Sequence, residues 1–234
     1  MVTQDELKQQ AAYRAAELVE SGMVVGLGTG STTEHAVKRI AERVKTGELT
    51  NIAGIPTSNR TEKLAHELGI SLVDFETHPE IHITIDGADE VDPNLNLIKG
   101  GGGALLREKV VAQASRRNII IVDESKLVPT LGTNWALPIE VIPFAIHTET
   151  LFLANLGGDV RLRTNDDKTP FRTDQNNMIL DTNFGPMEDP HGIALRLNQR
   201  AGIVEHGLFL ELTNDVIVAS ADGICHLKRN TRGD

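Results

Sequence analysis

The feature that most constrains the fold is an alternation of short apolar runs with helical segments over the first half of the chain. Apolar runs predict strands at residues 23–25, 52–55, 70–75, 81–85 and 118–122. Between them, apolar residues recur at helical spacing in residues 6–19, 36–44, 60–68 and 104–115. Alternation of this kind is typical of a mostly parallel sheet covered by helices.

From about residue 131 the pattern changes to separated strand candidates, with turn signals at residues 165–167 and 176–177. Helical stretches follow at residues 148–156 and 190–200, and three further strand candidates lie at 208–212, 216–220 and 224–227. We expect these last strands to return to the first sheet. The chain is therefore predicted to be an α/β protein, with a catalytic domain formed by residues 1–130 plus 208–234 and a small α+β domain formed by residues 131–207.

Composition and charge exclude several classes of protein. The chain has 23 Lys and Arg against 33 Asp and Glu, so its net charge of -10 disfavours a general affinity for nucleic acid or anionic lipid. No apolar run approaches the ~18 residues of a membrane span, and the start MVTQDELKQQ shows neither a signal core nor a transit pattern. The lone Cys225 allows no intramolecular disulfide, and in an apolar strand it is expected to be a packed thiol. We expect a soluble, cytoplasmic protein.

Residues 26–33, with the sequence GLGTGSTT, lie between a predicted strand and a predicted helix. A glycine turn in that position directs several backbone N–H groups and the positive end of the helix at one point, which is an anion site. Ser31 stands where a dinucleotide fingerprint needs a glycine, and the Gly-Lys-Ser/Thr of a nucleotide P-loop is absent. The segment therefore predicts a cradle for the phosphate of another ligand; the alternative is a glycine turn with an ordinary Ser/Thr N-cap.

Two further segments are expected at the same edge of the sheet, where the carboxyl ends of parallel strands meet. Asp86 and Asp89 follow a strand, while Lys99, the glycines at 100–103 and Glu108 lead into a helix. Taken separately, these are an acidic turn, a flexible loop and a surface ion pair of Glu108 with a lysine. Together, a base, a cation, further carboxylates and a phosphate clamp suffice to move a proton between carbons of a sugar phosphate without metal or cofactor.

Other chemistries are disfavoured. There is no Gly-x-Ser-x-Gly elbow, and there is no His-Glu-x-x-His motif that would indicate zinc. The eight histidines are interpreted as surface or satisfied residues: His35, His66, His78, His82, His147, His191, His206 and His226.

Five motifs resemble, in this order, those of the ribose-5-phosphate isomerase A family: GLGTGST, TSNRTEKLA, DGADEVD, KGGGGALLREK and VDESK. They lie in roughly residues 5–145, and the remainder has the length and texture of that family's small domain. The resemblance implies a Rossmann-like α/β domain, a smaller α+β (ferredoxin-like) domain acting as lid and in oligomerisation, a homodimer or homotetramer, and no cofactor. It also implies a pentose phosphate as the small-molecule partner.

Carried over residue by residue, the resemblance makes Glu108 the proton acceptor and donor, with Asp86, Asp89 and Lys99 as catalytic neighbours. The implied substrate-binding residues are Thr29, Gly30, Ser31, Thr32, Gly87, Ala88, Gly100, Gly101, Gly102 and Lys126. Members often carry a second lysine early in the first helix, whereas here Lys8 is followed by Gln9 and Gln10.

The implied activity is interconversion of D-ribose 5-phosphate and D-ribulose 5-phosphate through an enediolate, a step of the non-oxidative pentose phosphate pathway. An aminosugar phosphate deaminase or a phosphogluconolactonase would be expected to use a histidine, and none lies in these motifs. The alternative from a different class is a non-catalytic sugar-phosphate sensor domain, which should carry a basic DNA-binding segment that the sequence does not show.

Overall fold

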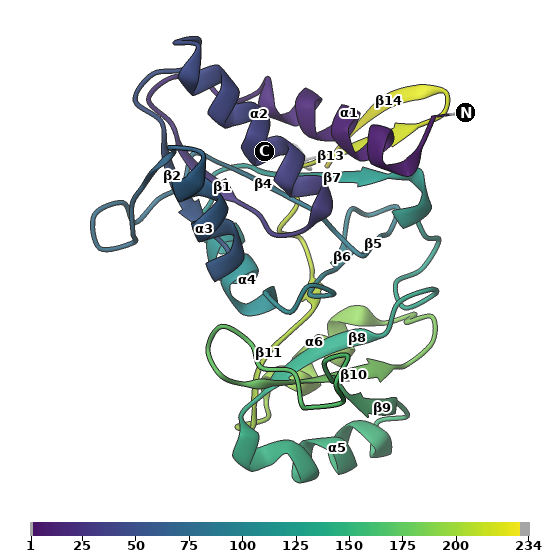
Figure 1. Ribbon diagram of the computed structural model, residues 1–234. Coiled ribbons are helices and arrows are strands. Elements are labelled where there is room, and N and C mark those ends of the chain that lie inside the picture. The colour runs from purple at the N-terminus through teal and green to yellow at the C-terminus, as the bar shows by residue number, and fades with distance from the viewer. Residues whose placement is uncertain (1, 230–234) are drawn as a thin grey trace, which may run out of the picture. The chain divides into compact units, whose positions relative to one another are not determined.

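A seven-stranded sheet forms the centre of the first of two units in the computed structural model, which describes residues 2–229 (Figure 1). The strands are β1 (Val24–Leu27), β2 (Ala53–Pro56), β3 (Ser71–Leu72), β4 (Ile83–Asp86), β7 (Asn118–Asp123), β13 (Asp215–Ser220) and β14 (Gly223–Lys228). Their order is β14-β13-β7-β4-β1-β2-β3, and every neighbouring pair is parallel except β13 with β14. The predicted mostly parallel sheet is confirmed, and so is the return of the strands predicted at 216–220 and 224–227 to it. The strand predicted at 208–212 does not return to this sheet: only Leu208–Phe209 is a strand, and it pairs with Leu97–Ile98 outside it.

The helices of this unit begin where the sequence supplies caps. Thr3 and Glu6 form a capping box at α1 (Gln4–Ala16), and Ser58 caps α3 (Asn59–Glu67) through the N–H of Thr61. The other two helices are α2 (Ser31–Lys45) and α4 (Leu105–Gln113).

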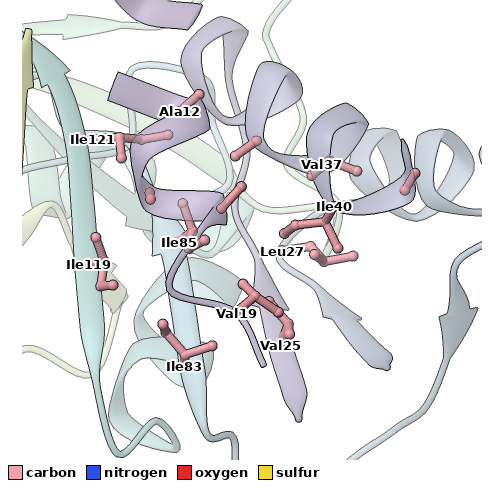
Figure 2. Packing of buried hydrophobic residues seen from close by; sticks show 14 of the residues in the cluster. Ala12, Val19, Val25, Leu27, Val37, Ile40, Ile83, Ile85, Ile119 and Ile121 are labelled. Carbon is pink, nitrogen blue, oxygen red and sulfur yellow. The ribbon is translucent and has the colours of Figure 1, made fainter. Parts of the chain in front are cut away.

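The core of this unit lies between the sheet and α1 and α2 (Figure 2). Its buried members include four alanines of α1. Small side chains there let α1 lie close to α2 and the strands, while larger residues such as Ile40, Ile85 and Ile121 fill the layer between them. Burying such a side chain contributes about 1.5–3 kcal/mol, so this layer is the main stabilising element of the first unit.

The second unit is built on a four-stranded antiparallel sheet. In chain order its elements are β8 (Leu137–Val141), α5 (Ile146–Asn155), β9 (Asp159–Leu162), β10 (Met178–Asn183), α6 (Pro190–Asn198) and β11 (Ile203–His206). The sheet order is β11-β8-β10-β9. A βαββαβ sequence with this order is the ferredoxin-like arrangement, as expected for the small α+β domain.

The bounds of the two units differ from the predicted domain bounds. The first unit comprises residues 2–88, Arg107–Lys126 and 211–229; the second comprises Asp89–Leu106 and Leu127–Leu210. Residues 89–106 join the second unit because β5 (Glu90–Val91) and β6 (Leu97–Ile98) form a separate three-stranded sheet with β12 (Leu208–Phe209). Asp89 and Lys99 therefore belong to the second unit, while Asp86 and Glu108 belong to the first.

Two local expectations are wrong. The strand predicted at residues 70–75 is reduced to Ser71–Leu72, which pairs with β2 alone at the edge of the sheet. Cys225 is exposed rather than packed, because β14 is the opposite edge strand and its residues are mostly outside the core. Within the described residues, no helix combines the length and apolar character needed to cross a membrane.

A buried carboxyl lies in the central part of the second unit. Glu140, on β8, is 0% exposed, and its Oε1 accepts hydrogen bonds from the Thr173 hydroxyl (2.8 Å) and the Asn177 amide (2.9 Å). Burial raises the pKa of Glu140, the charges of Asp174 and Glu205 add to this, and the two hydrogen bonds oppose it. Protonation of this carboxyl is therefore easier in the folded unit than in the unfolded chain.

We predict that Glu140→Gln changes how stability depends on pH. A raised folded-state pKa gives stability that is present below the unfolded-state pKa and lost as pH rises through the folded-state value. Glutamine stays neutral, so the melting temperature of Glu140→Gln relative to wild type should rise as pH increases from about 4 to 8. Thermal melts across this range check it, with exposed Glu62→Gln as control. A Glu140→Gln profile parallel to wild type would contradict the assignment.

Candidate active site

The glycine turn after β1 lies at the start of α2, where the sequence predicts an anion site. Gly30 occupies the N-cap position with φ 127°, a conformation that glycine adopts freely, and no side chain caps the helix. Ser31, Thr32 and Thr33 lie within the first turn. The alternative of a Ser/Thr side-chain cap is therefore wrong. The N–H groups of the first turn have no helical partner, so they are oriented for an anion together with the helix dipole.

The carboxylate of Asp86 holds this turn through hydrogen bonds to its backbone. Asp86 ends β4, is 3% exposed, and its Oδ1 accepts the N–H of Thr29 (3.1 Å) and of Gly87 (2.8 Å). The approach is close: a Cβ on Gly28 would lie 2.3 Å from Asp86 Oδ1. Glycine at position 28 is thus required by contact, and the carboxylate fixes the direction of the Thr29 peptide.

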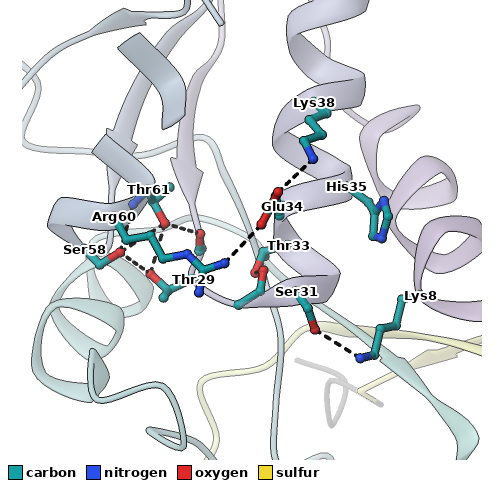
Figure 3. A network of polar contacts seen from close by, with 12 residues as sticks. Lys8, Thr29, Ser31, Thr33, Glu34, His35, Lys38, Ser58, Arg60 and Thr61 are labelled. Atoms are coloured by element: carbon teal, nitrogen blue, oxygen red, sulfur yellow. Dashed lines mark hydrogen bonds and ion pairs between the residues drawn. The ribbon is translucent and has the colours of Figure 1, made fainter. Parts of the chain in front are cut away.

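A group of hydroxyls supports the same turn from the side of α3 (Figure 3). The Oγ1 of Thr29 lies 2.7 Å from Thr57 Oγ1 and 2.8 Å from Ser58 Oγ. Thr57 and Thr61 in turn donate to the carbonyl oxygens of Leu27 (3.1 Å) and Gly28 (3.0 Å). Sequence reasoning missed that these hydroxyls, like Asp86, position the turn; the TSNRT motif after β2 was the available signal.

Charged side chains surround the turn. The ammonium of Lys8 donates to Ser31 Oγ (3.1 Å), so this lysine reaches the predicted cradle without a second lysine beside it (Figure 3). Glu34, in the first turn of α2, pairs with Lys38 (2.7 Å) and Arg60 (3.2 Å). The hydrogen bond from Lys38, with the charges of Lys38 and Arg60, lowers the pKa of Glu34 against the effect of burial. Two cations therefore compensate the negative charge of Glu34.

Glu108 lies on α4, which packs against the same sheet. Val111, one turn later, lies beside Gly26 of β1, where an added Cβ would be 2.8 Å from Val111 Cγ1. After the helix ends, Ser115 pairs with Ile81, which precedes β4, and the N–H of Arg116 donates to the Ile81 carbonyl (2.9 Å). The helix thus runs antiparallel to the strands, and Glu108 lies toward their carboxyl ends. Glu108 is 4% exposed, so the reading of a surface ion pair is wrong.

Lys126 follows the adjacent strand β7, in the short helix η1 (Glu124–Lys126). The nearby Asp123 ends β7; burial alone would raise its pKa, but hydrogen bonds from Ser125 and Gln4 and the charge of Lys126 hold the pKa below its usual value. Thr29–Thr32, Asp86, Gly87, Ala88 and Lys126 thus follow the carboxyl ends of β1, β4 and β7 in the first unit.

The second unit holds the remaining predicted site residues. The N–H of Gly101 donates to Asp89 Oδ2 (2.7 Å), and the N–H of Gly103 closes a turn on the Gly100 carbonyl (2.9 Å). Lys99 is buried, and its ammonium lies 5.4 Å from the centre of the Phe209 ring. The glycine run is therefore an ordered turn, rather than a flexible loop, that is bonded to Asp89.

Sequence reasoning missed the function of Glu90, which the motif DGADEVD contains. Its buried carboxylate accepts three backbone N–H groups, from Gly132 (2.6 Å), Asn134 (2.5 Å) and Trp135 (2.8 Å). It fixes the loop before β8 within the second unit. Across residues 2–229, no group of three or more His, Cys, Asp and Glu side chains could hold a metal ion.

Comparisons of the sequence and of the structure with known proteins point to the same family. The family model of ribose 5-phosphate isomerase A (phosphoriboisomerase A) matches residues 53–223. A ribose-5-phosphate isomerase A of Desulfatibacillum aliphaticivorans is 61% identical, over 97% of this chain and 99% of the relative.

Two solved structures match over nearly the whole chain. A D-ribose-5-phosphate isomerase in complex with phospho-erythronic acid has a TM-score of 0.95 and 39% identity, covering 97% of this chain and 100% of that one. The ribose 5-phosphate isomerase from Plasmodium falciparum has a TM-score of 0.93 and 42% identity, covering 97% and 99%.

The fold is that of an α/β protein with a mostly parallel sheet, and the comparisons define its class as an isomerase. The chain belongs to the ribose-5-phosphate isomerase A family. It is an aldose–ketose isomerase of the pentose phosphate pathway, and the alternative of a non-catalytic sensor domain is set aside because the matched family and relatives are enzymes.

We predict that Gly28→Ala disrupts the cradle. The added Cβ would lie 2.3 Å from the Asp86 carboxylate and 2.6 Å from the Ile85 carbonyl oxygen. Because the Ile85 oxygen belongs to the backbone of β4, it cannot move away as a side chain could. Overpacking of this kind costs about 1–3 kcal/mol of unfolding free energy. Denaturant unfolding checks it, with Gly87→Ala as control because its Cβ would meet nothing nearer than 3.9 Å. Equal stability of the two variants would contradict the close approach.

Proposed function

We propose that this chain interconverts D-ribose 5-phosphate and D-ribulose 5-phosphate by proton transfer through a cis-enediolate, with Glu108 as the base and no cofactor. The observation that carries this assignment is the buried carboxylate of Glu108 on a helix whose first turn lies toward the carboxyl ends of the strands, the edge that also carries the cradle. Membership of the isomerase family supports the reaction.

The cradle would bind the substrate phosphate. Its donors are the N–H groups at the start of α2, the hydroxyls of Thr29, Ser31 and Thr32, and the ammonium of Lys8 beside Ser31. Thr29 and Gly30 supply the turn itself. Binding energy from the phosphate, which does not react, then orients C1 and C2 of the sugar.

Proton transfers would follow from the carboxylates. Asp86 would shuttle a hydroxyl proton as the furanose ring opens, since it is the last residue of β4 and is held by two N–H groups. Glu108 would take the proton from C2 and return it to C1.

The charge that develops on the enediolate oxygen requires donors. Lys99 would supply a cation, and the glycine run would supply backbone N–H groups with no side chain to obstruct the approach of the sugar. By analogy with oxyanion holes, each such donor is worth roughly 3 kcal/mol in the transition state.

The other predicted site residues would shape the pocket. Asp89 would orient this turn through Gly101. Gly87, Ala88, Gly100, Gly102 and Lys126 would line the substrate.

A bound acid in a relative supports the same reading. One similar structure is of an isomerase in complex with phospho-erythronic acid. This molecule carries a phosphate at one end and a carboxylate, with two oxygens sharing a negative charge, at the other. We propose that it binds to this chain too, because the phosphate suits the cradle and the carboxylate resembles the charge distribution of the enediolate.

We also propose a homodimer or homotetramer in the cytoplasm. Large apolar side chains are exposed on the second unit, with Phe144 97% exposed, and Leu151 and Leu195 more than half exposed on α5 and α6. Their burial against a second copy would remove unfavourable contact with water. A single cysteine with no possible intramolecular disulfide suits a reducing compartment.

We predict that Glu108→Gln abolishes most of the activity. Glutamine keeps the shape and removes the basicity, so kcat for ribose 5-phosphate should fall by about 10²–10⁴. The assay follows ribulose 5-phosphate formation in excess chelator, with Glu124→Gln, an exposed residue of η1, as control. We expect wild type and Glu124→Gln to turn over substrate in the presence of chelator, and Glu108→Gln to lose this turnover. Activity of Glu108→Gln near wild type would rule out its role as base.

A further inference from the structure

Arg163 links the glycine run to the four-stranded sheet of the second unit. It follows β9 directly, and its Nη1 donates to the carbonyl oxygens of Gly100 (2.8 Å) and Gly101 (3.1 Å). The other edge of the guanidinium pairs with the carboxylate of Asp181 on β10, through Nε (2.8 Å) and Nη2. The planar fork therefore spans from the sheet to two successive carbonyls.

This contact determines which way the peptides of the run face. In a trans peptide the C=O and the next N–H point in opposite directions. Because the carbonyls of Gly100 and Gly101 face Arg163, the N–H groups of Gly101 and Gly102 face away from it. The first of these donates to Asp89 Oδ2 at 2.7 Å. The second belongs to Gly102, whose residue surface is exposed.

A second contact from the same segment holds the end of the run. The guanidinium lies 5.9 Å from the centre of the Phe171 ring. The backbone N–H of Phe171 donates to the Arg163 carbonyl oxygen (2.9 Å). A Cβ on Gly103 would lie 2.4 Å from that ring, so the ring packs directly on the backbone. Glycines have several accessible backbone conformations, and these contacts select one of them.

We propose that Arg163, anchored by Asp181, is a positioning residue for the isomerisation: it fixes the peptide planes of residues 100–102 so that the Gly102 N–H is presented to the enediolate oxygen and the Gly101 N–H to Asp89. Lysine cannot replace it, because a point charge cannot bind a carboxylate by two bonds and two carbonyls at once. This inference rests on the proposed function, in which the glycine run stabilises the developing charge.

The test compares Arg163→Lys with Arg161→Lys, an exposed arginine of β9 that pairs with Asp159. In Arg163→Lys, kcat for ribose 5-phosphate should fall by about 10²-fold, the cost of a small misplacement of a catalytic group. The KM and the inhibition constant of inorganic phosphate should stay near wild type, because the cradle is formed by residues of the first unit. Arg161→Lys should keep wild-type kcat.

A purely structural role predicts a different pattern. A lower melting temperature with unchanged kcat per folded molecule in Arg163→Lys would overturn the proposal. If Arg163→Lys does not fold, Asp181→Asn serves as the test, because it keeps the arginine and removes its charged anchor. A reduced kcat with unchanged phosphate inhibition supports the proposal. An unchanged kcat overturns it.

Hydrogen exchange provides a readout that does not depend on turnover. The amide of Gly101 should exchange faster in Arg163→Lys than in wild type or Arg161→Lys, as its bond to Asp89 is released. Unchanged exchange would overturn the positioning role. Absence of isomerase activity in wild type would instead contradict the proposed function, while faster exchange in Arg163→Lys would still show that Arg163 orders the run.

Discussion

The approach of Gly28 to the Asp86 carboxylate is the contact on which the first unit's site depends. It joins the ends of two neighbouring parallel strands, and it leaves no room for a side chain at position 28. The carboxylate holds the Thr29 N–H, so the turn leads into α2 with its first N–H groups oriented toward one point. A buried carboxyl thereby orders the turn in which the anion site is proposed, through hydrogen bonds from the N–H groups of Thr29 and Gly87.

The second unit uses the same device with other residues. Glu90 holds the loop before β8 through three N–H groups, and the pair of Arg163 and Asp181 holds the glycine run through its carbonyls. In each case a buried or partly buried charge fixes backbone that has little intrinsic preference. In the proposed mechanism, some side chains react with the substrate. Other charged residues, which need not touch the substrate, hold the backbone around those side chains in place.

Local patterns predicted the elements whose structure depends mainly on residues close together in the sequence. The parallel sheet and the glycine turn at Gly30 follow from periodicity and from residues adjacent in sequence. The family resemblance supplied the catalytic assignments, which remain proposals. Contacts between distant segments were not predictable: Arg163 lies 62 residues from Gly101, and no local signal links them. The exposure of Cys225 depends on which strand forms the sheet edge, and an apolar pattern does not specify this.

The most direct test of proton transfer through an enediolate is isomerisation of ribose 5-phosphate in D₂O, with the ribulose 5-phosphate analysed by nuclear magnetic resonance. A carboxylic acid formed on Glu108 carries an exchangeable proton, so the account predicts deuterium at C1 of the product. Rapid conversion with no deuterium at C1 would mean that hydrogen moves directly from C2 to C1, and it would contradict a mechanism in which Glu108 carries the proton.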